Sequence, residues 1–377
     1  MKIQKVNSPA LFNDFINVHR IIYKGNNDWI CPLDKDIKKV FDEHENIHFK
    51  TGKAKQWILN SEQNQPIGRI AAFFDSTQFK GKDHFGGVGF YECIDDLNAS
   101  KLLFDTAINW LKSEGINIVN GPINFGEKNA FWGLMVAGYK NPSYKENFNW
   151  EYYEKQFLNY GFVQNTEQTT SEITYANFDM ERFKKLSARV MQNPDYSFEH
   201  FKMNELERFG LDFVEIYNKA WSHREDFVPM TKERIVAEIL ELKPIIMEEA
   251  IWFAYAHGKP IGFYVSVIDV NQIFKELNGK MNWWAMLKFL YYKTFGKVNR
   301  IRGEVFGVIP EYQEKGIETG MIISLYNAIQ KFPKINTSEL GWIGDFNPKM
   351  HGLFEKLGAY TTKVHRTYKL ALSNVNL

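Results

Sequence analysis

The sequence predicts an α/β protein of mixed α+β type, built from two similar halves that each form a mixed, mostly antiparallel sheet flanked by helices. Three observations predict this fold class. The length of 377 residues exceeds what a single hydrophobic core usually holds. Strand-like and helix-like patterns follow in the same order in both halves: hairpin, strand, helix, strand, short helix and strand. The two short helices also end alike, at residues 157–161 (FLNYG) and 354–358 (FEKLG).

The first half opens with a helical pattern and a hairpin signal. Its expected elements are a helix over residues 9–22, strands over 55–59, 66–74 and 88–94, a helix over 98–112, a strand over 116–119, a helix over 152–159 and two strands within 162–178. The polar segment 60–65 supplies the hairpin turn. Gly115 ends the helix over 98–112, in which apolar residues recur at helical spacing.

The second half repeats this order. Its expected elements are helices over residues 206–221 and 232–242, strands over 250–255, 261–268 and 301–309, a helix over 317–331, a strand over 339–343, a helix over 349–356 and a closing strand over 364–370. We place the junction between the halves within residues 179–197. The sequence therefore predicts two domains, residues 1–180 and residues 181–377.

Composition and charge exclude several classes of protein. Lys and Arg number 46 against 45 Asp and Glu, a net charge of +1, so we expect no nucleic-acid partner. Cys31 and Cys93 are too few for a disulfide scaffold, and the nine histidines show no ligand spacing, so no metal site is expected. The start lacks a signal-peptide pattern and no apolar run reaches about 18 residues, which predicts a cytoplasmic protein without a transmembrane segment.

The most informative segment is the turn between the strand over 301–309 and the helix over 317–331. Pro310 ends the strand, and the chain turns through Gly316 into the helix. A helix start exposes free backbone N–H groups at the positive end of the helix dipole, which suits a diphosphate. Gln313 adds a neutral donor and Lys315 a positive charge, while Gly316 permits close backbone approach.

This turn resembles the central motif of the GNAT superfamily of N-acetyltransferases, which is Val-x-Pro, a short spacer, Gln or Arg, two residues, Gly, one residue, and Gly or Ala. Val308, Pro310, Gln313 and Gly316 match, whereas Glu318 stands where Gly or Ala is usual. The chain is also similar to a GNAT-like subgroup that tolerates an acidic residue there. The further matching segments are Trp221, 227–231 (FVPMT), 269–272 (DVNQ), 340–343 (LGWI) with Asn347, 68–72 (GRIAA) and 121–124 (GPIN).

The resemblance implies two tandem GNAT-like acyl-CoA N-acyltransferase folds. In that fold the fourth and fifth strands splay apart, and pantetheine pairs with the free edge of the fourth strand. The implied activity is acyl transfer, in the first instance acetyl transfer, from acetyl-CoA or another acyl-CoA as co-substrate to an unknown amine. The implied cofactor-binding residues are Val308, Gln313, Glu314, Lys315, Gly316, Ile317 and Glu318, with the amide of Val308 facing the thioester carbonyl.

The first half lacks an equivalent of this turn. Residues 91–100 contain no Gly, no basic residue and three acidic groups, which repel a diphosphate and instead cap the helix. We therefore expect only the second domain to bind CoA. The loop over 121–133 is either a wall of the substrate site or a well-packed connection.

Acyl transfer to an amine needs a base for the amine proton and an acid for the leaving thiolate. Many GNAT enzymes carry a Tyr seven residues after an Asn, but counting from Asn347 leads to Phe354, which has no hydroxyl. A thiol pKa near about 8.5 lets the thiolate leave without an acid. Strand alternation places Glu304, Phe306 and Val308 on one face. The catalytic candidates are Glu304, as base, and Asn347, with Asp345 as an alternative base. The ionisable residues near Phe354 are expected mainly at the surface or in packing: His351, Glu355, Tyr360 and His365.

The 31 Phe, 18 Tyr and 10 Trp residues make 16% of the chain aromatic, and residues 271–303 concentrate them. This insertion carries seven basic residues against Glu276 alone: Lys275, Lys280, Lys288, Lys293, Lys297, Arg300 and Arg302. The simplest expectation is a helical insertion packed between the domains with solvated lysines. The alternatives are a holder for a fatty-acyl group and peripheral membrane contact through residues 274–295.

Two other functions stay open. The chain could be a non-catalytic protein of this fold that binds a ligand or partner, because Phe354 and Glu318 depart from the enzymes' pattern. It could also use another donor, as the tandem Fem-type aminoacyl transferases and myristoyl transferases do. The acceptor amine, the acyl chain length and the oligomeric state cannot be read from the sequence.

Overall fold

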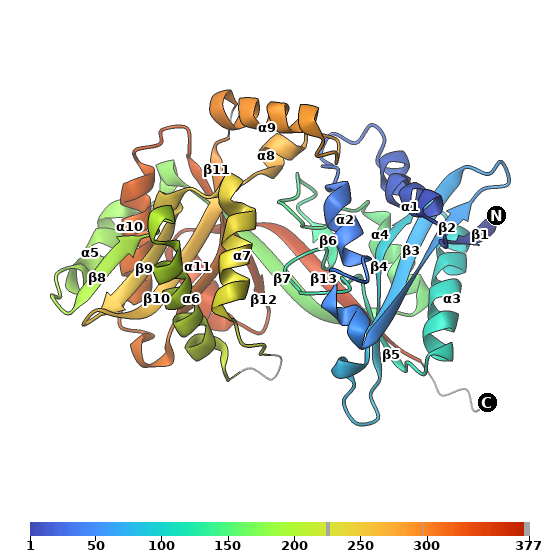
Figure 1. Cartoon of the computed structure of the whole chain (residues 1–377), viewed down its shortest axis with the longest axis horizontal. Helices are drawn as coiled ribbons and strands as arrows, with labels where there is room; N and C mark the ends of the chain where they lie inside the picture. Colours follow the sequence, from blue (N-terminus) through green and yellow to red (C-terminus); the bar gives the residue numbers. More distant parts are fainter. Residues whose placement is uncertain (224–226, 297, 373–377) are drawn as a thin grey trace.

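The computed structural model describes residues 1–223, 227–296 and 298–372. The helices, shown in Figure 1, are α1 (Pro9–Ile22), α2 (Asp34–Val40), α3 (Leu97–Ser113), α4 (Tyr152–Tyr160), α5 (Met180–Met191), α6 (Leu206–Trp221), α7 (Lys232–Leu242), α8 (Asn271–Phe274), α9 (Trp283–Phe295), α10 (Ile317–Ile329) and α11 (Pro348–Lys356). The strands are β1 (Lys2–Lys5), β2 (Gly52–Asn60), β3 (Pro66–Asp75), β4 (Phe85–Cys93), β5 (Ile118–Gly121), β6 (Leu134–Ala137), β7 (Val163–Thr174), β8 (Tyr196–His200), β9 (Ile251–Ala256), β10 (Lys259–Ile268), β11 (Arg300–Val308), β12 (Thr337–Gly344) and β13 (Tyr360–Ala371).

These strands form one continuous mixed sheet that runs through both halves (Figure 1). Its order is β1-β2-β3-β4-β5-β13-β7-β12-β11-β10-β9-β8, with β6 paired to β13. Neighbouring strands are antiparallel except for β4 with β5 and β11 with β12, so each half contains one parallel pair at the equivalent place. The predicted fold class, a mixed sheet flanked by helices in each of two similar halves, is confirmed.

The two halves exchange their last strands. β7 follows the first half in sequence but pairs with β12 of the second half, and β13 closes the chain by pairing with β5 and β6 of the first half. β7 and β13 also pair with each other along most of their length. The closing strand, expected to complete the second half, therefore completes the first. The halves cannot separate without breaking this ladder.

Most predicted elements are present, and the differences have local causes. The helix predicted over residues 9–22 coincides with α1, where Ser8 caps the first turn and Pro9 occupies the first helical position. The two strands expected within 162–178 are one strand, β7, because no Gly or Pro interrupts it. The junction expected within 179–197 contains a helix and an edge strand, α5 and β8. Asp179 caps α5, and the helix buries Phe183, Ser187 and Val190.

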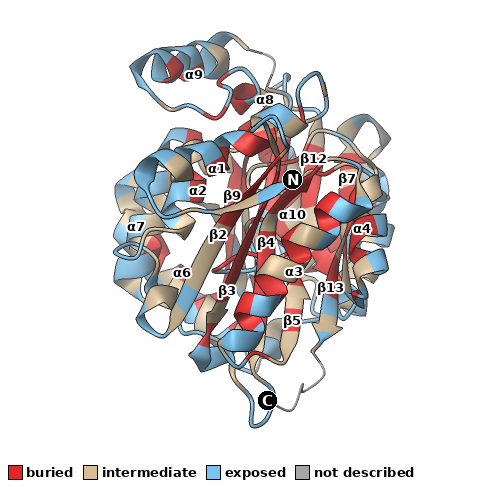
Figure 2. Ribbon diagram, turned by 90° about the vertical axis from the view of Figure 1, so that its right-hand side faces the viewer, coloured by how far each residue is buried: buried red, intermediate tan, exposed pale blue. Residues whose placement is uncertain are grey.

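Two large apolar clusters fill the space between the sheet and its helices, one in each half. In the first, α3 lays Leu103, Phe104 and Ala107 on the sheet, all fully buried. In the second, Phe213 of α6 stacks on Phe263 of β10 at 4.4 Å between ring centroids. Figure 2 shows the central strands buried between these layers. Much of the aromatic content is therefore core.

Candidate functional site

The site begins where β11 and β12 separate. The two strands pair in parallel only from Arg300 with Thr337 to Gly303 with Leu340. Beyond that point, which we call the fork, β11 continues to pair with β10 but has no strand on its other side. A Cβ on Gly341 would lie 2.4 Å from the Gly303 carbonyl oxygen, so the close approach at the fork requires glycine there.

The free edge of β11 presents the backbone of Val308. Ile309 donates its amide to the carbonyl of Ile261 at 3.0 Å, so the antiparallel alternation turns the amide and carbonyl of Val308 away from β10. Gln313 Nε2 donates to that carbonyl at 3.0 Å. The Val308 amide thus points to the side from which a pantetheine amide or a thioester carbonyl would approach.

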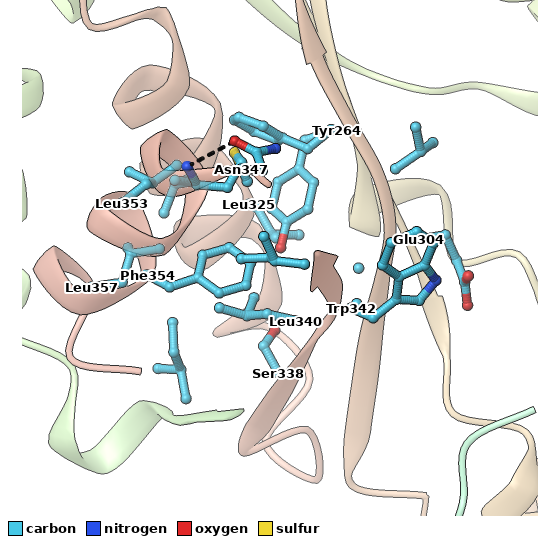
Figure 3. A pocket seen from close by; sticks show the side chains of 18 of the residues that line it. Tyr264, Glu304, Leu325, Ser338, Leu340, Trp342, Asn347, Leu353, Phe354 and Leu357 are labelled. Atoms are coloured by element: carbon cyan, nitrogen blue, oxygen red, sulfur yellow. Dashed lines mark hydrogen bonds between the residues drawn. The ribbon is translucent and has the colours of Figure 1, made fainter. Parts of the chain in front are cut away.

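A cavity of about 240 Å³ opens at the fork, and we call it the fork cavity. Figure 3 shows Glu304 and Trp342 on one side of it and Phe354 and Leu357 on the other. The walls come from β7 and the following turn, α6, β10, β11, α10, β12 and α11. They are mainly apolar, and the lining residues include Ile173, Phe178, Trp221, Tyr264, Phe306, Leu325, Tyr326, Leu340, Met350, Leu353, Phe354 and Leu357.

Glu304 lies at the rim of the fork cavity. Its side chain is 42% exposed and contacts Arg302, with Oε1 at 3.3 Å from Nε. The pKa of the Glu304 carboxyl is raised because the surrounding protein removes part of its hydration. Arg302 pulls that pKa down, while Glu339 and Asp269 push it up. A carboxylate with a raised pKa beside a cavity suits a general base.

Asn347 also lines the fork cavity but already has a structural partner. Its Oδ1 accepts the amide of Met350 at 3.3 Å and so caps α11 (Figure 3). Phe354 projects from the same helix into the cavity. A catalytic role for Asn347 stays a prediction.

Tyr264 of β10 is a cavity residue that the sequence analysis did not single out. Burial raises the pKa of its hydroxyl to about 12, so it stays protonated and can donate a hydrogen bond near neutral pH. The register pairs Tyr264 with Phe306, but it shifts at Glu304, because Ser266 is opposite Gly303 and Val265 is opposite Val305. Glu304 is therefore the extra residue of a β-bulge, and the alternation predicted to place it on the face of Phe306 and Val308 is interrupted there. The sequence does not specify the register between β10 and β11, so it could not assign Tyr264 to the cavity.

The turn predicted to hold a diphosphate is formed as a helix start. Gly316 adopts φ +85° and caps α10, and Glu314 before it has φ +63°. Lys315 lies over the Tyr312 ring at 4.9 Å, and Glu314 pairs with Lys349 of α11 at 2.9 Å. None of these turn residues lines the fork cavity, although α10, which starts at Ile317, contributes Ile322, Leu325 and Tyr326 further along.

Glu318 lies in the first turn of α10, at the helix start that the sequence predicts to bind a diphosphate. Burial raises the pKa of its carboxyl, while the backbone amides of Glu318 and Glu314 donate to it and lower that pKa. These amides belong to the donors expected to face a diphosphate. The helix start therefore already holds a negative group from its own chain.

Beside the fork, a buried ionic network joins the two halves. Lys363 of β13 contacts Glu146 of the first half and Glu339 of β12, the latter at 3.0 Å, and Arg302 reaches Glu339 at 3.2 Å. Burial alone would raise the pKa of Glu339, but the Lys363 ammonium and Arg302 hold it below its usual value. Sequence analysis missed this cluster because its members are far apart in the chain.

The other segments noted in the sequence have structural roles. Asp269 pairs with Arg300 at 2.6 Å, and Asn271 donates to the carbonyl of Pro142 at 2.8 Å. In the first half, Asp96 accepts the amides of Asn98 and Ala99 and caps α3, as its acidic turn predicts. The loop over 121–133 buries Phe125 and Phe131 and does not line the fork cavity, as expected of a packed connection.

Within residues 1–223, 227–296 and 298–372, no group of His, Cys, Asp and Glu side chains is arranged to hold a metal ion. Over the same residues, no helix combines the length and apolar character needed to cross a membrane.

No protein-family model matches the chain. Protein YghO of Escherichia coli (strain K12) is 26% identical over 378 residues, which cover 94% of this chain and 91% of that protein. A bacterial ceramide synthase of Caulobacter vibrioides (strain NA1000 / CB15N) is 23% identical over 383 residues, covering 99% of this chain and 98% of that one.

The solved structures that share the fold include the following two. A tandem GNAT protein from the clavulanic acid biosynthesis pathway has a TM-score of 0.56 at 8% identity and covers 98% of each chain. A GCN5-related glucosamine N-acetyltransferase region of a fungal multi-domain GH3 beta-N-acetylglucosaminidase has a TM-score of 0.57 at 12% identity. That match covers 98% of this chain and 38% of the fungal one. The chain therefore has the tandem GNAT fold, as its sequence predicts.

Proposed function

We propose that this chain is an N-acyltransferase that moves a long acyl group from a pantetheine thioester, such as an acyl-CoA, to an amine. The fork cavity carries this proposal, because it is apolar, lies at the free edge of β11 and offers far more room than a two-carbon acetyl group needs. The similarity to a bacterial ceramide synthase supports it, since a ceramide is an amide of a fatty acid and a long-chain amine.

In the proposed reaction, the thioester lies along β11 with its acyl chain in the fork cavity. The amine nitrogen attacks the thioester carbonyl, whose oxygen accepts the Val308 amide as negative charge develops. Glu304 lies four residues from Val308 on the same strand, so it takes the proton that the nitrogen loses through intervening water. The C–S bond breaks, and the leaving thiolate takes a proton from water. Phe354 supplies no acid, but a thiol pKa near about 8.5 makes the thiolate an adequate leaving group. The protonated hydroxyl of Tyr264 is available to donate a hydrogen bond to a polar group of a substrate bound in the cavity.

The donor has two candidate forms. An acyl-CoA would place its diphosphate at the start of α10, where the Glu318 carboxylate already accepts the Glu314 amide. Glu318 therefore favours a second candidate, a donor with no diphosphate at this turn, such as an acyl chain carried on the phosphopantetheine of a carrier protein. Both donors carry the same thioester and would use the same cavity.

The test is a matrix of donors and acceptors. Acetyl-CoA, palmitoyl-CoA and palmitoyl-carrier protein are each incubated with long-chain amines and with short polar amines, and amide products are measured by mass spectrometry. We expect a palmitoyl donor to give product with a long-chain amine and acetyl-CoA to give little. Product only with acetyl-CoA would exclude a long-chain role. Calorimetric binding of donors without any product would support a non-catalytic binding protein.

A further inference from the structure

Helix α9 carries the largest group of exposed apolar side chains on the described surface. Its Trp283, Trp284 and Phe295 are 66%, 69% and 70% exposed. The helix projects above α8 at the top of the molecule in both views, which are at right angles (Figures 1 and 2). Its other exposed apolar residues are Met286, Leu287, Leu290 and Tyr291.

The structure holds α9 as a regular helix. Asn282 caps it by accepting the amide of Ala285 at 3.0 Å, and Phe289 packs near Phe274 of α8. The apolar cluster beneath it includes Leu33 of the first half and Ile245 of the second. The sequence predicted that this insertion packs between the domains, and only one face of α9 does so. The opposite face, with its tryptophans, faces solvent.

The charge on this segment has one sign. Residues 277–303 contain no Asp or Glu. Arg300 and Arg302 are engaged in the buried ion pairs beside the fork, and Lys293 donates to the carbonyl of Pro244 at 2.5 Å. Lys280 and Lys288 belong to the segment as well, while Lys297 lies outside the described residues. Apolar surface is thus combined with positive charge.

We propose that α9 docks in the plane of a lipid bilayer that contains anionic phospholipid. A solvent-facing helix with clustered Trp, Tyr and Phe and nearby lysines has the chemistry of an interfacial membrane helix. Two copies of the chain meeting through α9 would bring lysines together without acidic partners, whereas anionic headgroups complement them. The bilayer is the occupant that matches both the apolar face and its charge.

This position also relates α9 to the fork. The strand that follows α9 is β11, and Glu304 lies four residues beyond Arg300, about 13 Å along an extended strand. β11 therefore leads from the end of α9 toward the rim of the fork cavity. The inference adds to the proposed function by naming where a membrane-resident acyl donor or acceptor would enter.

Vesicle flotation tests this proposal with the full chain. Vesicles of pure phosphatidylcholine are compared with vesicles that contain about 30% phosphatidylglycerol. We expect the protein to float with the anionic vesicles and to be released by high salt. The double variant Trp283→Ser/Trp284→Ser should lower the partition coefficient about tenfold or more. The matched control Leu240→Ser, at an exposed residue of α7, should leave it unchanged.

The outcomes separate the possible occupants. Absence of flotation, or equal flotation of wild type and the double variant, would overturn the proposal. A dimer in light scattering that the double variant dissociates, without vesicle binding, would assign the face to a second copy and also overturn it. Circular dichroism checks that the variant is folded. Because the vesicles carry no thioester or amine, failure here is distinct from failure of the proposed acyl transfer.

Discussion

The Glu318 carboxylate accepts the backbone amide of Glu314, so the turn before α10 closes on a negative group supplied by its own helix. Gly316, in the left-handed conformation between them, permits this closure. An acyl-CoA that placed its diphosphate here would have to displace this carboxylate or accept a like charge beside it. We therefore predict that Glu318 determines which donor binds at this turn.

Replacing Glu318 by Ala should tighten the binding of CoA about tenfold, because the like charge is removed and the turn amides become available. Titration calorimetry with CoA measures this. Glu355→Ala, at an exposed residue of α11, is the matched control and should bind CoA as the wild type does. If Glu318→Ala binds CoA equally or less tightly, the carboxylate does not compete with a diphosphate at this turn.

The same carboxylate predicts a pH dependence of CoA binding. Burial raises the pKa of Glu318, so protonation begins at a higher pH than for an ordinary Glu. The neutral form repels a diphosphate less, and the affinity for CoA should therefore rise as the pH falls from about 8 to about 5.5. Glu318→Ala corrects for titration of the CoA phosphates. Identical pH profiles for wild type and variant would contradict this prediction.

Glu304→Gln tests the proposed base. Removing a general base should lower kcat by about 10²- to 10⁴-fold and leave the donor affinity nearly unchanged. Because the wild-type base must be ionised, activity should fall as the pH drops through the raised pKa of Glu304, and the variant should lose this dependence. The exposed Glu311→Gln serves as control. A lower donor affinity with an unchanged pH profile would assign Glu304 to binding instead.

Lys363→Met tests the network that joins the halves. It leaves the buried carboxylates of Glu146 and Glu339 without their ammonium partner, which should lower the free energy of unfolding by about 3–5 kcal/mol. Urea denaturation measures this. Lys369→Met, at an exposed residue of the same strand, should change stability little.

The pH dependence of the stability lost in Lys363→Met shows whether charge causes that loss. Lys363 and its neighbours hold the pKa of Glu339 below its usual value, although burial acts in the opposite direction. This stabilisation is present above about pH 4.5 and is lost as the pH falls through the depressed pKa. The difference between wild type and Lys363→Met should therefore shrink in acid. A constant difference would show that lost packing, rather than charge, causes the destabilisation.

The sequence predicted the helix starts and turns that depend on neighbouring residues. Pro9 and Ser8 start α1, Gly316 turns the chain into α10, and the Asp96 cap closes the equivalent turn of the first half. The ladder between β7 and β13 and the Lys363–Glu339 pair depend on which strands become neighbours, and the order of elements along the chain does not specify this. The sequence could not predict which face of α9 is exposed for a similar reason, because a helix that is apolar on all sides does not indicate which side packs against the protein.

The length of the acyl chain is the last property that the fork cavity should determine. Leu353 projects from α11 into the cavity, and Leu353→Trp would fill part of it (Figure 3). We expect this variant to lose activity with a palmitoyl donor and to keep or gain activity with shorter chains, because a shortened cavity rejects the distal carbons. Leu240→Trp, on the exposed side of α7, controls for the added ring. The measurement is kcat/KM across a series of acyl donors of increasing length. An equal loss at every length would mean that the substitution disturbs the fold, and no change at any length would place the acyl chain outside the fork cavity.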